Sequence, residues 1–388
     1  MTFQLAILTS LVLSASCLPT TVFAEASTVS KKLMPVSITF MEALAPKDTT
    51  SSERFQKEYE FSIQTGKDLT KQTLSNCGYE LIDNKVLYDA SDNLQALEQA
   101  KKAEKNNAWM IVGPRRSNHY LLAAQGASNT PSVSIMASSK EVYELNSLHL
   151  TMAQSNENMA NALADETKSR LEKNKSITYF SIISKDCISC IDFAKSFDLK
   201  ASKINLNKIS EFSFTGEQPS LDEIKNIIQK AKPHFILIPN YSVVSAHIMN
   251  VVQSWGISTL YIGSDGWGDS KYGFVHNSPQ LSKVNGLTIK GFPPADKGLE
   301  YFDLGKQILK NPTLAANFPV SGTAQSILKT MEALTQMLCD FKPKTKEEFI
   351  SRFKVSGQKY FINPWGVSVF NLVNGEIVFD KTLKVSRK

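Results

Sequence analysis

Short apolar runs alternate along the chain with longer segments in which apolar residues recur at helical spacing. The clearest example is the buried-type run Phe235-Ile-Leu-Ile238, followed by a helical stretch and a second apolar run that leads into residues 261–267. Two apolar runs that bracket an amphipathic helix predict a βαβ unit, which builds a parallel sheet. Ligands bind beyond the carboxyl ends of the strands in such sheets.

The same alternation extends over most of the chain and predicts two similar α/β lobes in succession. Strands are expected at 36–41, as a strand pair around 79–88, at 109–112, 133–136, 148–152 and 177–183, near 204, at 212–214 and 286–291, and as two closing strands that flank Asn374-Gly375. Helices are expected at 52–76, after Asp92 with Gln95 in capping-box spacing, from Ser117, from Ser155 to Leu171, through Leu199, after Ser220 with Glu223, and at 299–309, 320–339 and 346–353. Binding sites commonly lie between two lobes.

The N-terminal residues read as a segment that is removed before folding. Residues 1–24 contain no Lys, Arg, Asp or Glu, residues 5–16 are apolar, and small residues stand at the −3 and −1 positions before Glu25. This pattern predicts a secretory signal peptide and a periplasmic protein. An uncleaved anchor is disfavoured because the run is shorter than the roughly 20 residues needed to span a membrane. A lipid anchor at Cys17 ranks second, since no branched apolar residue stands three positions before it.

Composition supports a soluble globular protein and argues against a nucleic-acid partner. The chain has 388 residues, 42% hydrophobic and 21% charged, with a net charge of +6. The densest basic clusters, Lys101-Lys102, Arg115-Arg116 and residues 342–346, lack the interleaved aromatic residues of nucleic-acid grooves. The length suits two lobes of ordinary domain size, and a monomer is expected.

Export would place the cysteines in an oxidising compartment, where disulfide bonds form. Four remain after cleavage, an even number in an oxidising compartment. Cys187 and Cys190 follow a predicted strand, and we favour a local structural disulfide there. A thiol-redox pair at a helix N-terminus is the alternative. Whether Cys77 pairs with Cys339 stays open, because geometry decides it.

Polar loops at the predicted strand ends are the candidate ligand site. Residues 113–117, ending in Ser117, and residues 137–139 offer amides and hydroxyls that suit a carboxylate. Tyr241, Asp265 and Trp267 lie at the ends of the other two strands, where a carboxylate, a phenol and an indole suit a cation. Ordinary roles compete with each assignment: Ser117 as an N-cap, Asp265 as a turn residue and Trp267 as a core residue.

The sequence contains no recognisable catalytic, metal-binding or cofactor-binding motif, which favours a binding role. The five histidines, at positions 119, 149, 234, 247 and 276, show no metal-ligand spacing. No nucleophile elbow, phosphate-binding P-loop or dinucleotide fingerprint occurs. We therefore expect neither an enzyme nor a bound cofactor or metal.

Four motifs in the same order resemble the type I periplasmic substrate-binding proteins of ABC transporters, in the branch that binds leucine, isoleucine and valine. They are Gly113-Pro-Arg-Arg-Ser117, the run from Pro131 to the Ala137-Ser-Ser139 loop, the aromatic Tyr241, and Gly263-Ser-Asp265-Gly266. The similarity covers nearly the whole chain after the signal peptide.

The resemblance implies two doubly wound lobes joined by three crossovers, with residues 30–153 plus 290–362 in one lobe and 154–289 plus 363–388 in the other. It implies that Ser117, the Ala137 backbone and Ser139 hold an α-carboxylate, and that Asp265 and Tyr241 meet an α-ammonium. The implied partners are an amino-acid-like ligand and the membrane permease of an ABC transporter. A sensor or interaction protein of the same fold is the rival.

Three departures from the family pattern set this chain apart. Residues 186–188 replace a Tyr-Gly pair, and residues 43–46 replace the usual first loop. Arg115 and Arg116 are unusual beside a carboxylate site and suit a second anionic group. The ligand therefore need not be a branched-chain amino acid.

Overall fold

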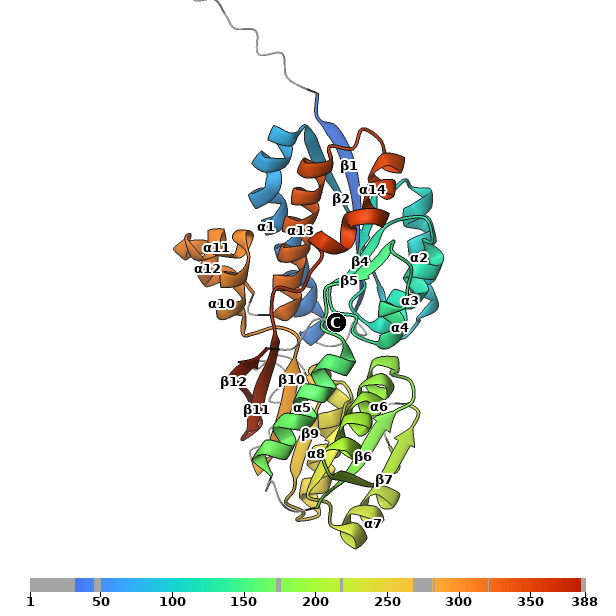
Figure 1. Cartoon of the computed structure of the whole chain (residues 1–388), viewed down its shortest axis with the longest axis vertical. Coiled ribbons are helices and arrows are strands. Elements are labelled where there is room, and N and C mark those ends of the chain that lie inside the picture. The colour runs from blue at the N-terminus through green and yellow to red at the C-terminus, as the bar shows by residue number, and fades with distance from the viewer. Residues whose placement is uncertain are drawn as a thin grey trace, which may run out of the picture. The chain divides into compact units, whose positions relative to one another are not determined.

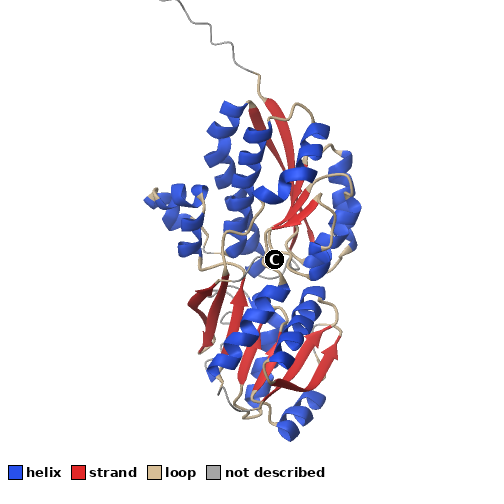
Figure 2. Cartoon of the chain, viewed as in Figure 1, coloured by secondary structure: helices blue, strands red, loops and turns tan. Residues whose placement is uncertain are grey.

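The computed structural model describes residues 32–44, 50–171, 176–216, 219–267, 281, 283–319 and 321–384. The predicted signal peptide, Cys17, residues 45–46 of the first loop and His276 lie outside these residues. The described chain forms two β-sheets, each with helices on both faces (Figures 1 and 2). None of the helices among the described residues is both long and apolar enough to cross a membrane.

The first sheet is parallel throughout, in the order β2-β1-β3-β4-β5. Its strands are β1 (Met34–Leu44), β2 (Tyr79–Asp89), β3 (Met110–Val112), β4 (Ser132–Ser134) and β5 (His149–Thr151). The helices of this part are α1 (Thr50–Cys77), α2 (Leu94–Lys105), α3 (Ser117–Gly126), the short α4 (Lys140–Tyr143) and, from late in the chain, α13 (Gly322–Phe341) and α14 (Lys346–Tyr360).

Alternating side chains of the first sheet enter two separate cores. Ile38 and Phe40 of β1 pack with α1, α13 and α14, whereas Met41 packs with the alanines of α2 and α3. In Figure 1, α1 runs beside α13, and Gly66 gives α1 a close approach to Met331. A strand buried on both faces needs apolar residues on both, and Ile38, Phe40 and Met41 supply them in β1.

The second sheet has the order β12-β11-β10-β9-β8-β6-β7, and its strands pair in parallel except that β11 is antiparallel to both of its neighbours, β10 and β12. Its strands are β6 (Ile177–Ser184), β7 (Leu206–Phe214), β8 (Phe235–Ile238), β9 (Leu260–Gly263), β10 (Asn285–Lys290), β11 (Val367–Val373) and β12 (Glu376–Leu383). Helices α5 (Asn156–Arg170) and α6 (Ile188–Lys203) pack on one face, and α7 (Leu221–Ala231) and α8 (Ser242–Ser254) on the other. The predicted βαβ unit is therefore confirmed as β8-α8-β9.

Three crossover segments join the sheets, at residues 152–155, 291–294 and 361–366. Hydrogen bonds connect the three segments to one another. The side-chain Nδ2 of Asn363 donates to Met152 O at 2.9 Å and to Gly291 O at 3.1 Å. Gln154 Nε2 donates to Trp365 O at 3.1 Å. These segments run through the predicted lobe boundaries, whose positions stay a prediction.

Between the second and third crossovers, short helices precede α13. They are α10 (Ala295–Gly298), η3 (Leu299–Tyr301), α11 (Asp303–Leu309) and α12 (Pro312–Asn317). The helix predicted at 299–309 is thus divided, and α12 was not predicted. Helix α14 also continues seven residues past the predicted end at Phe353.

Two edge strands correct the sequence prediction. Residues 79–89 form one strand rather than a pair, and the strands expected near 204 and at 212–214 are the single strand β7. Both strands carry polar residues in the middle, which resemble a turn in sequence. They remain extended because each pairs along its length with an inner strand and exposes alternate side chains at the sheet edge.

Candidate functional site

Loops from both sheets surround a pocket of about 280 Å³. The loops follow β3 and β4 of the first sheet and β8 and β9 of the second, with the start of α6 on one side. The lining residues are Arg115, Arg116, Ser117, Met136, Ser138, Ser189, Tyr241, Ser242, Val243, Asp265 and Gly266. Polar residues of both signs of charge therefore meet at the carboxyl ends of parallel strands, where ligands of such sheets bind.

The loop after β3 is fixed by Gly113. Its φ is +93°, and a Cβ atom there would lie 2.1 Å from the carbonyl oxygen of Met41. Only glycine fits this close crossing of the end of β1. The turn leads directly to Ser117 at the first position of α3 and places both arginines on the pocket side.

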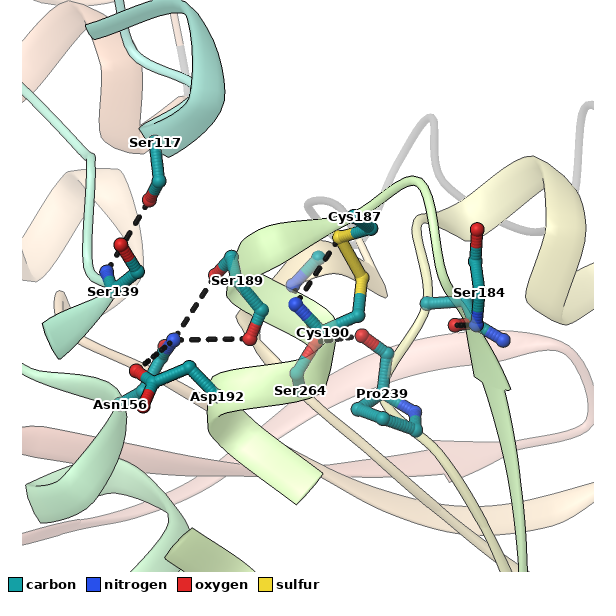
Figure 3. Close-up of a disulfide and its surroundings, with 12 residues drawn as sticks. Ser117, Ser139, Asn156, Ser184, Cys187, Ser189, Cys190, Asp192, Pro239 and Ser264 are labelled. Atoms are coloured by element: carbon teal, nitrogen blue, oxygen red, sulfur yellow. Dashed lines mark hydrogen bonds between the residues drawn. A yellow bond between two sulfur atoms is a disulfide. The ribbon is translucent and has the colours of Figure 1, made fainter. Parts of the chain in front are cut away.

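Ser117 lines the pocket, but its hydroxyl is engaged within the protein. Its Oγ accepts hydrogen bonds from the amides of Ser138 and Ser139, both at 3.2 Å, and Figure 3 shows the bond to Ser139. These amides were candidates for holding a ligand carboxylate. They instead join the β4 loop to the start of α3.

Ala137 and Ser139 do not line the pocket, contrary to the sequence prediction. The Ala137 amide donates to Ser134 Oγ at 3.0 Å, so it is directed into its own turn. Ser139 is fully buried, and its hydroxyl has no hydrogen-bond partner in the described structure. Ser138, between them, reaches the pocket, and its Oγ lies 3.2 Å from Ser189 Oγ.

Ser189 belongs to a polar cluster at the start of α6 (Figure 3). Asn156 Nδ2 donates to Ser189 O at 3.0 Å, to Ser189 Oγ at 3.1 Å and to Asp192 Oδ2 at 3.0 Å. The Lys140 amide donates to the same Asp192 oxygen at 2.9 Å. Burial raises the pKa of Asp192, opposed by these two donors. The cluster connects α4 of the first sheet to α5 and α6 of the second.

A disulfide joins Cys187 and Cys190 beside this wall of the pocket (Figure 3). Both residues are buried, and Cys187 Sγ accepts a hydrogen bond from the Cys190 amide at 3.1 Å, which caps α6. A second disulfide joins Cys77 to Cys339 and thereby links the ends of α1 and α13, a pairing that the sequence left open.

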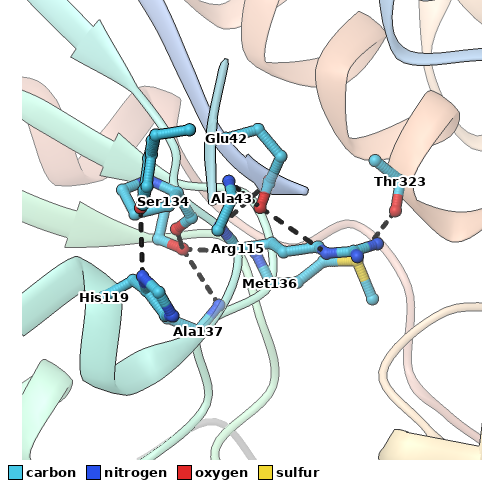
Figure 4. A network of polar contacts seen from close by, with 10 residues as sticks. Glu42, Ala43, Arg115, His119, Ser134, Met136, Ala137 and Thr323 are labelled. Atoms are coloured by element: carbon cyan, nitrogen blue, oxygen red, sulfur yellow. Dashed lines mark hydrogen bonds and ion pairs between the residues drawn. The ribbon is translucent and has the colours of Figure 1, made fainter. Parts of the chain in front are cut away.

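The buried Glu42 forms a charge pair with the half-buried Arg115, which lines the pocket (Figure 4). Glu42 is fully buried at the end of β1, and its carboxylate accepts the amides of Ala43 at 2.9 Å and Arg115 at 3.2 Å. The Arg115 guanidinium lies 3.6 Å from the carboxylate and 3.9 Å from the ring centroid of Phe55. Burial raises the pKa of Glu42, and the guanidinium opposes that rise.

Arg116 and Tyr241 face each other across the pocket. The guanidinium carbon lies 5.3 Å from the centroid of the Tyr241 ring, which is within cation–π range. Tyr241 immediately precedes α8 and keeps 37% of its surface exposed. These two residues and Asp265 are the predicted site residues that, with Ser117, the structure brings together.

Asp265 opens the 3₁₀ turn η1 (Asp265–Trp267) after β9 and is half-buried. Loss of water around the carboxyl raises its pKa to about 6, and the ammonium of Lys290 opposes this rise. Lys290 is only 1% exposed at the end of β10, with its Nζ 5.5 Å from the Phe370 ring centroid and 5.8 Å from that of Phe292. A buried lysine thus stands next to the predicted cation site.

Trp267 does not reach the pocket, which corrects its assignment to the ligand site. It is fully buried, and its indole Nε1 donates to Ile238 O at 2.9 Å. The 3₁₀ turn folds the ring back over Gly263, where an added Cβ would lie 1.8 Å from the indole. Trp267 therefore anchors the Asp265 turn to β8 and β9 through its buried indole.

Sequence reasoning missed four residues of this region: Glu42, Ser138, Ser189 and Lys290. Ser138 lies inside the loop 137–139 that was identified, but roles were assigned only to its neighbours Ala137 and Ser139. Lys290 had a usable signal, since it ends a strand that contains no other charged residue. Among the described residues, no group of three or more His, Cys, Asp or Glu side chains is arranged to hold a metal ion.

Comparisons with known proteins reveal the fold. No protein-family profile matches the chain, and no curated protein matches it significantly in sequence. Solved structures do match. The leucine-binding protein LivK of Thermotoga maritima has a TM-score of 0.71 at 12% identity, over 90% of this chain and 99% of that one.

Two further matches carry ligands in their descriptions. LivJ of Streptococcus pneumoniae, a branched-chain amino acid transporter substrate-binding protein in complex with isoleucine, has a TM-score of 0.64 at 13% identity and covers 91% of this chain and 100% of that chain. An ABC-transporter solute-binding protein of R. palustris in complex with benzoate has a TM-score of 0.68 at 12% identity, over 91% and 98%. Two doubly wound lobes of the type I periplasmic binding protein fold are therefore confirmed.

Proposed function

We propose that the chain is an exported solute-binding protein that captures a small polar ligand, an amino acid or a related compound, for ABC-type import. The ligand would be handed to a membrane permease, and the protein itself would perform no chemistry. The leader-like residues 1–24 support export to the periplasm. The fold supports the role, because its solved relatives include proteins described in complex with isoleucine and with benzoate.

The pocket between the strand ends is the observation that carries this proposal. Besides Arg115, whose guanidinium is paired with Glu42, it combines the guanidinium of Arg116, the phenol of Tyr241 and the carboxylate of Asp265 within about 280 Å³. A few convergent polar groups in a cavity of this order are typical of small-molecule sites. Ser117 and Ser138 complete the polar wall, and Met136 and Val243 supply apolar surface.

A thermal-shift screen of the mature protein over amino acids and small carboxylic acids tests the role. A ligand at 100-fold excess over its Kd should add about 2.7 kcal/mol to the free energy of unfolding. Hits would be confirmed by titration calorimetry. If no amino acid or small carboxylic acid shifts the unfolding temperature, the chain is not a solute-binding protein of this kind, and the sensor role gains support.

Arg116→Gln locates the binding in the pocket. Loss of a charge-assisted hydrogen bond to an anionic ligand group should weaken binding by at least about tenfold, since such bonds contribute about 1.5–3 kcal/mol. Arg352→Gln is the matched control, because Arg352 lies on α14 in an exposed ion pair with Glu348. Equal affinities of the two variants would show that the ligand binds elsewhere.

A further inference from the structure

A set of hydrogen bonds joins the two sheets along one side of the pocket. We call its members, Ser138, Lys140, Asn156, Ser189 and Asp192, the polar latch, and Figure 3 shows the last three. Ser138 and Lys140 follow β4 of the first sheet, whereas Ser189 and Asp192 lie on α6 of the second. Asn156 opens α5, directly after the first crossover. The latch consists of protein groups alone, so it favours contact between the sheets with or without a ligand.

Two backbone amides make the direct contacts of the latch. The Lys140 amide donates to Asp192 Oδ2 and the Asn156 amide donates to Ser138 O, both at 2.9 Å. Lys140 is the first residue of α4, so its amide has no acceptor inside that helix. Asn156 is fully buried, and its Nδ2 also donates to Asp192 and to the carbonyl and hydroxyl oxygens of Ser189. The Lys140 amide and the Asn156 side chain therefore both depend on the first two turns of α6.

The Cys187–Cys190 disulfide closes a ring around Ser189 in the first turn of α6. Cys187 is the residue before this helix, and its Sγ accepts the Cys190 amide at 3.1 Å. Both cysteines are buried and pack with Ile183, near the end of β6, and with Ala194. First helical turns fray because their amides lack intrahelical acceptors. The ring opposes fraying here, since it closes the turn and packs it against the end of β6.

The short separation of these two cysteines favours a local role for their bond. Cys187 and Cys190 are 3 positions apart, and a loop of this size restricts the unfolded chain little. The Cys77–Cys339 bond, with a separation of 262, restricts it far more. The main effect of the local bond is therefore on the folded turn that it closes, and this turn carries Ser189.

We propose that the Cys187–Cys190 disulfide is a positioning element for ligand binding. It holds the start of α6 where the polar latch can form, and the latch favours the closed arrangement, in which loops of both sheets meet around the pocket. The effect on a ligand rests on the solute-binding role proposed above. A ligand that contacts both sheets binds the closed arrangement, so its apparent affinity falls in proportion to the closed fraction. Loss of the disulfide lowers that fraction.

Amide hydrogen exchange of the ligand-free protein tests the latch directly. The Lys140 amide reports the contact between the sheets. The Ser139 amide donates to Ser117 Oγ within the first sheet and is the internal reference. In the double variant Cys187→Ser, Cys190→Ser, exchange at Lys140 should accelerate about threefold to tenfold relative to Ser139, the equivalent of one weakened hydrogen bond. An unchanged ratio would overturn the proposal.

The double variant Cys77→Ser, Cys339→Ser is the matched control. It removes a disulfide of larger expected effect on stability, and neither of its cysteines lines the pocket. The exchange ratio should stay at the wild-type value in this control. Acceleration of the same size in both double variants would mean that general destabilisation opens the latch, and the proposal would be wrong. Serine at position 187 keeps an oxygen that can cap α6, so the first variant removes chiefly the covalent bond.

Titration calorimetry with isoleucine and with benzoate, the ligands of two solved relatives, measures the effect on binding. Either probe that binds the wild-type protein should bind the Cys187→Ser, Cys190→Ser variant about threefold to tenfold more weakly. Asp192→Ala should cause a loss of the same order, because Asp192 belongs to the latch but does not line the pocket. Asp165→Ala is its control and should bind like the wild type, since Asp165 pairs with Lys200 and so links α5 to α6 without reaching the first sheet.

A combined variant shows whether the disulfide acts through the latch. In the Asp192→Ala background, loss of the disulfide should weaken binding little further, because both changes open the same contact. Additive losses would contradict the proposal. If neither probe nor any compound of the wider screen binds, the solute-binding role fails, and the exchange ratio at Lys140 still decides whether the disulfide holds the latch. Circular dichroism of each variant would be recorded, so that a loss of binding is not confused with a loss of structure.

Discussion

The Asp265 carboxyl is destabilising to the folded protein when it is ionised. Its ordinary pKa of 3.8 is raised to about 6 by burial, against the opposing effects of Lys290 and of the amides of Asp265 and Gly266. For an acid whose pKa rises on folding, the cost is absent below the unfolded value. The cost grows as the pH passes from 3.8 to about 6, and it is complete above that.

Asp265→Asn should therefore raise the free energy of unfolding at about pH 7.5, by up to about 3 kcal/mol, and change it little at about pH 4. Urea denaturation at the two pH values measures the effect. The matched control is Asp68→Asn, at an exposed position of α1 that accepts a hydrogen bond from Gln64. A gain of equal size at both pH values would show that the carboxyl titrates normally in the folded state.

At the residue scale, the sequence predicts where a residue lies along the fold better than it predicts where its side chain points. Ser117, Tyr241, Asp265 and Arg116 reach the pocket as expected, because each lies where a parallel strand ends. Ala137, Ser139 and Trp267 were also placed there by position. They turn inward because hydrogen bonds hold them: Ala137 donates within its own turn, whereas Ser139 and Trp267 donate to other elements, and no spacing rule encodes such bonds.

For Lys290, the sequence predicts the position in its strand but not which residues of other strands lie beside it. Its place at the end of β10 was predictable, but its nearness to Asp265 depends on which strands are neighbours in the sheet. That order follows from packing of the whole lobe, and sequence order alone does not give it. The fixed register then brings a buried lysine to the same edge of the sheet as Asp265.

At the element scale, helix caps distinguish two serines that look alike in sequence. Ser155 and Ser220 both precede helices in the extended conformation. The Ser155 hydroxyl accepts the Asn158 amide at 3.2 Å, whereas the Ser220 hydroxyl makes no cap hydrogen bond, so its predicted capping box does not form. At Asp92 the carboxylate does accept, from the Leu94 amide at 3.0 Å.

Ser155→Ala should therefore lower the free energy of unfolding by about 1 kcal/mol, the usual contribution of an N-cap. Ser220→Ala provides the paired comparison and should change it by less than about 0.5 kcal/mol. Chemical denaturation of both variants under the same conditions decides the matter. Losses of equal size would mean that sequence position, and not the hydrogen bond, sets the contribution of each serine.

Helices and strands were predictable wherever the pattern of apolar residues followed a single helical or strand period. Inner strands such as β8 are apolar throughout, and α13 has a long apolar face, so both were found. Edge strands were misread because β2 and β7 need only one partner and expose polar residues mid-strand. The short α4 and α12 were missed, since four to six residues carry too little periodicity to be seen.

At the scale of the whole molecule, the chain leaves the first sheet, builds most of the second and then returns. Helices α13 and α14, from the return segment, complete the first core, and β11 and β12 complete the second sheet. The order of β-α units predicted two lobes, but it could not reveal which late helices close which core. The Cys77–Cys339 disulfide joins the start of this path to its return, across a sequence separation of 262.

This disulfide should stabilise the protein far more than the local one. A cross-link acts mainly by restricting the unfolded chain, so its effect grows with the enclosed loop. The loop-entropy relation gives roughly 5 kcal/mol or more for the 262-residue separation and roughly 2 kcal/mol for Cys187–Cys190, whose separation is 3 residues. Native strain and residual unfolded structure reduce the first value most, so about 3–5 kcal/mol is expected.

Paired serine variants measure both contributions. Cys77→Ser with Cys339→Ser should shift the urea midpoint strongly to lower concentration, and Cys187→Ser with Cys190→Ser should shift it weakly. Reduction of the wild-type protein with dithiothreitol should reproduce the sum of the two shifts, because the sites lie in different lobes. A larger loss from the Cys187–Cys190 pair would mean that the local bond stabilises the start of α6 and the Ser189 wall directly, and that chain entropy is not the dominant effect.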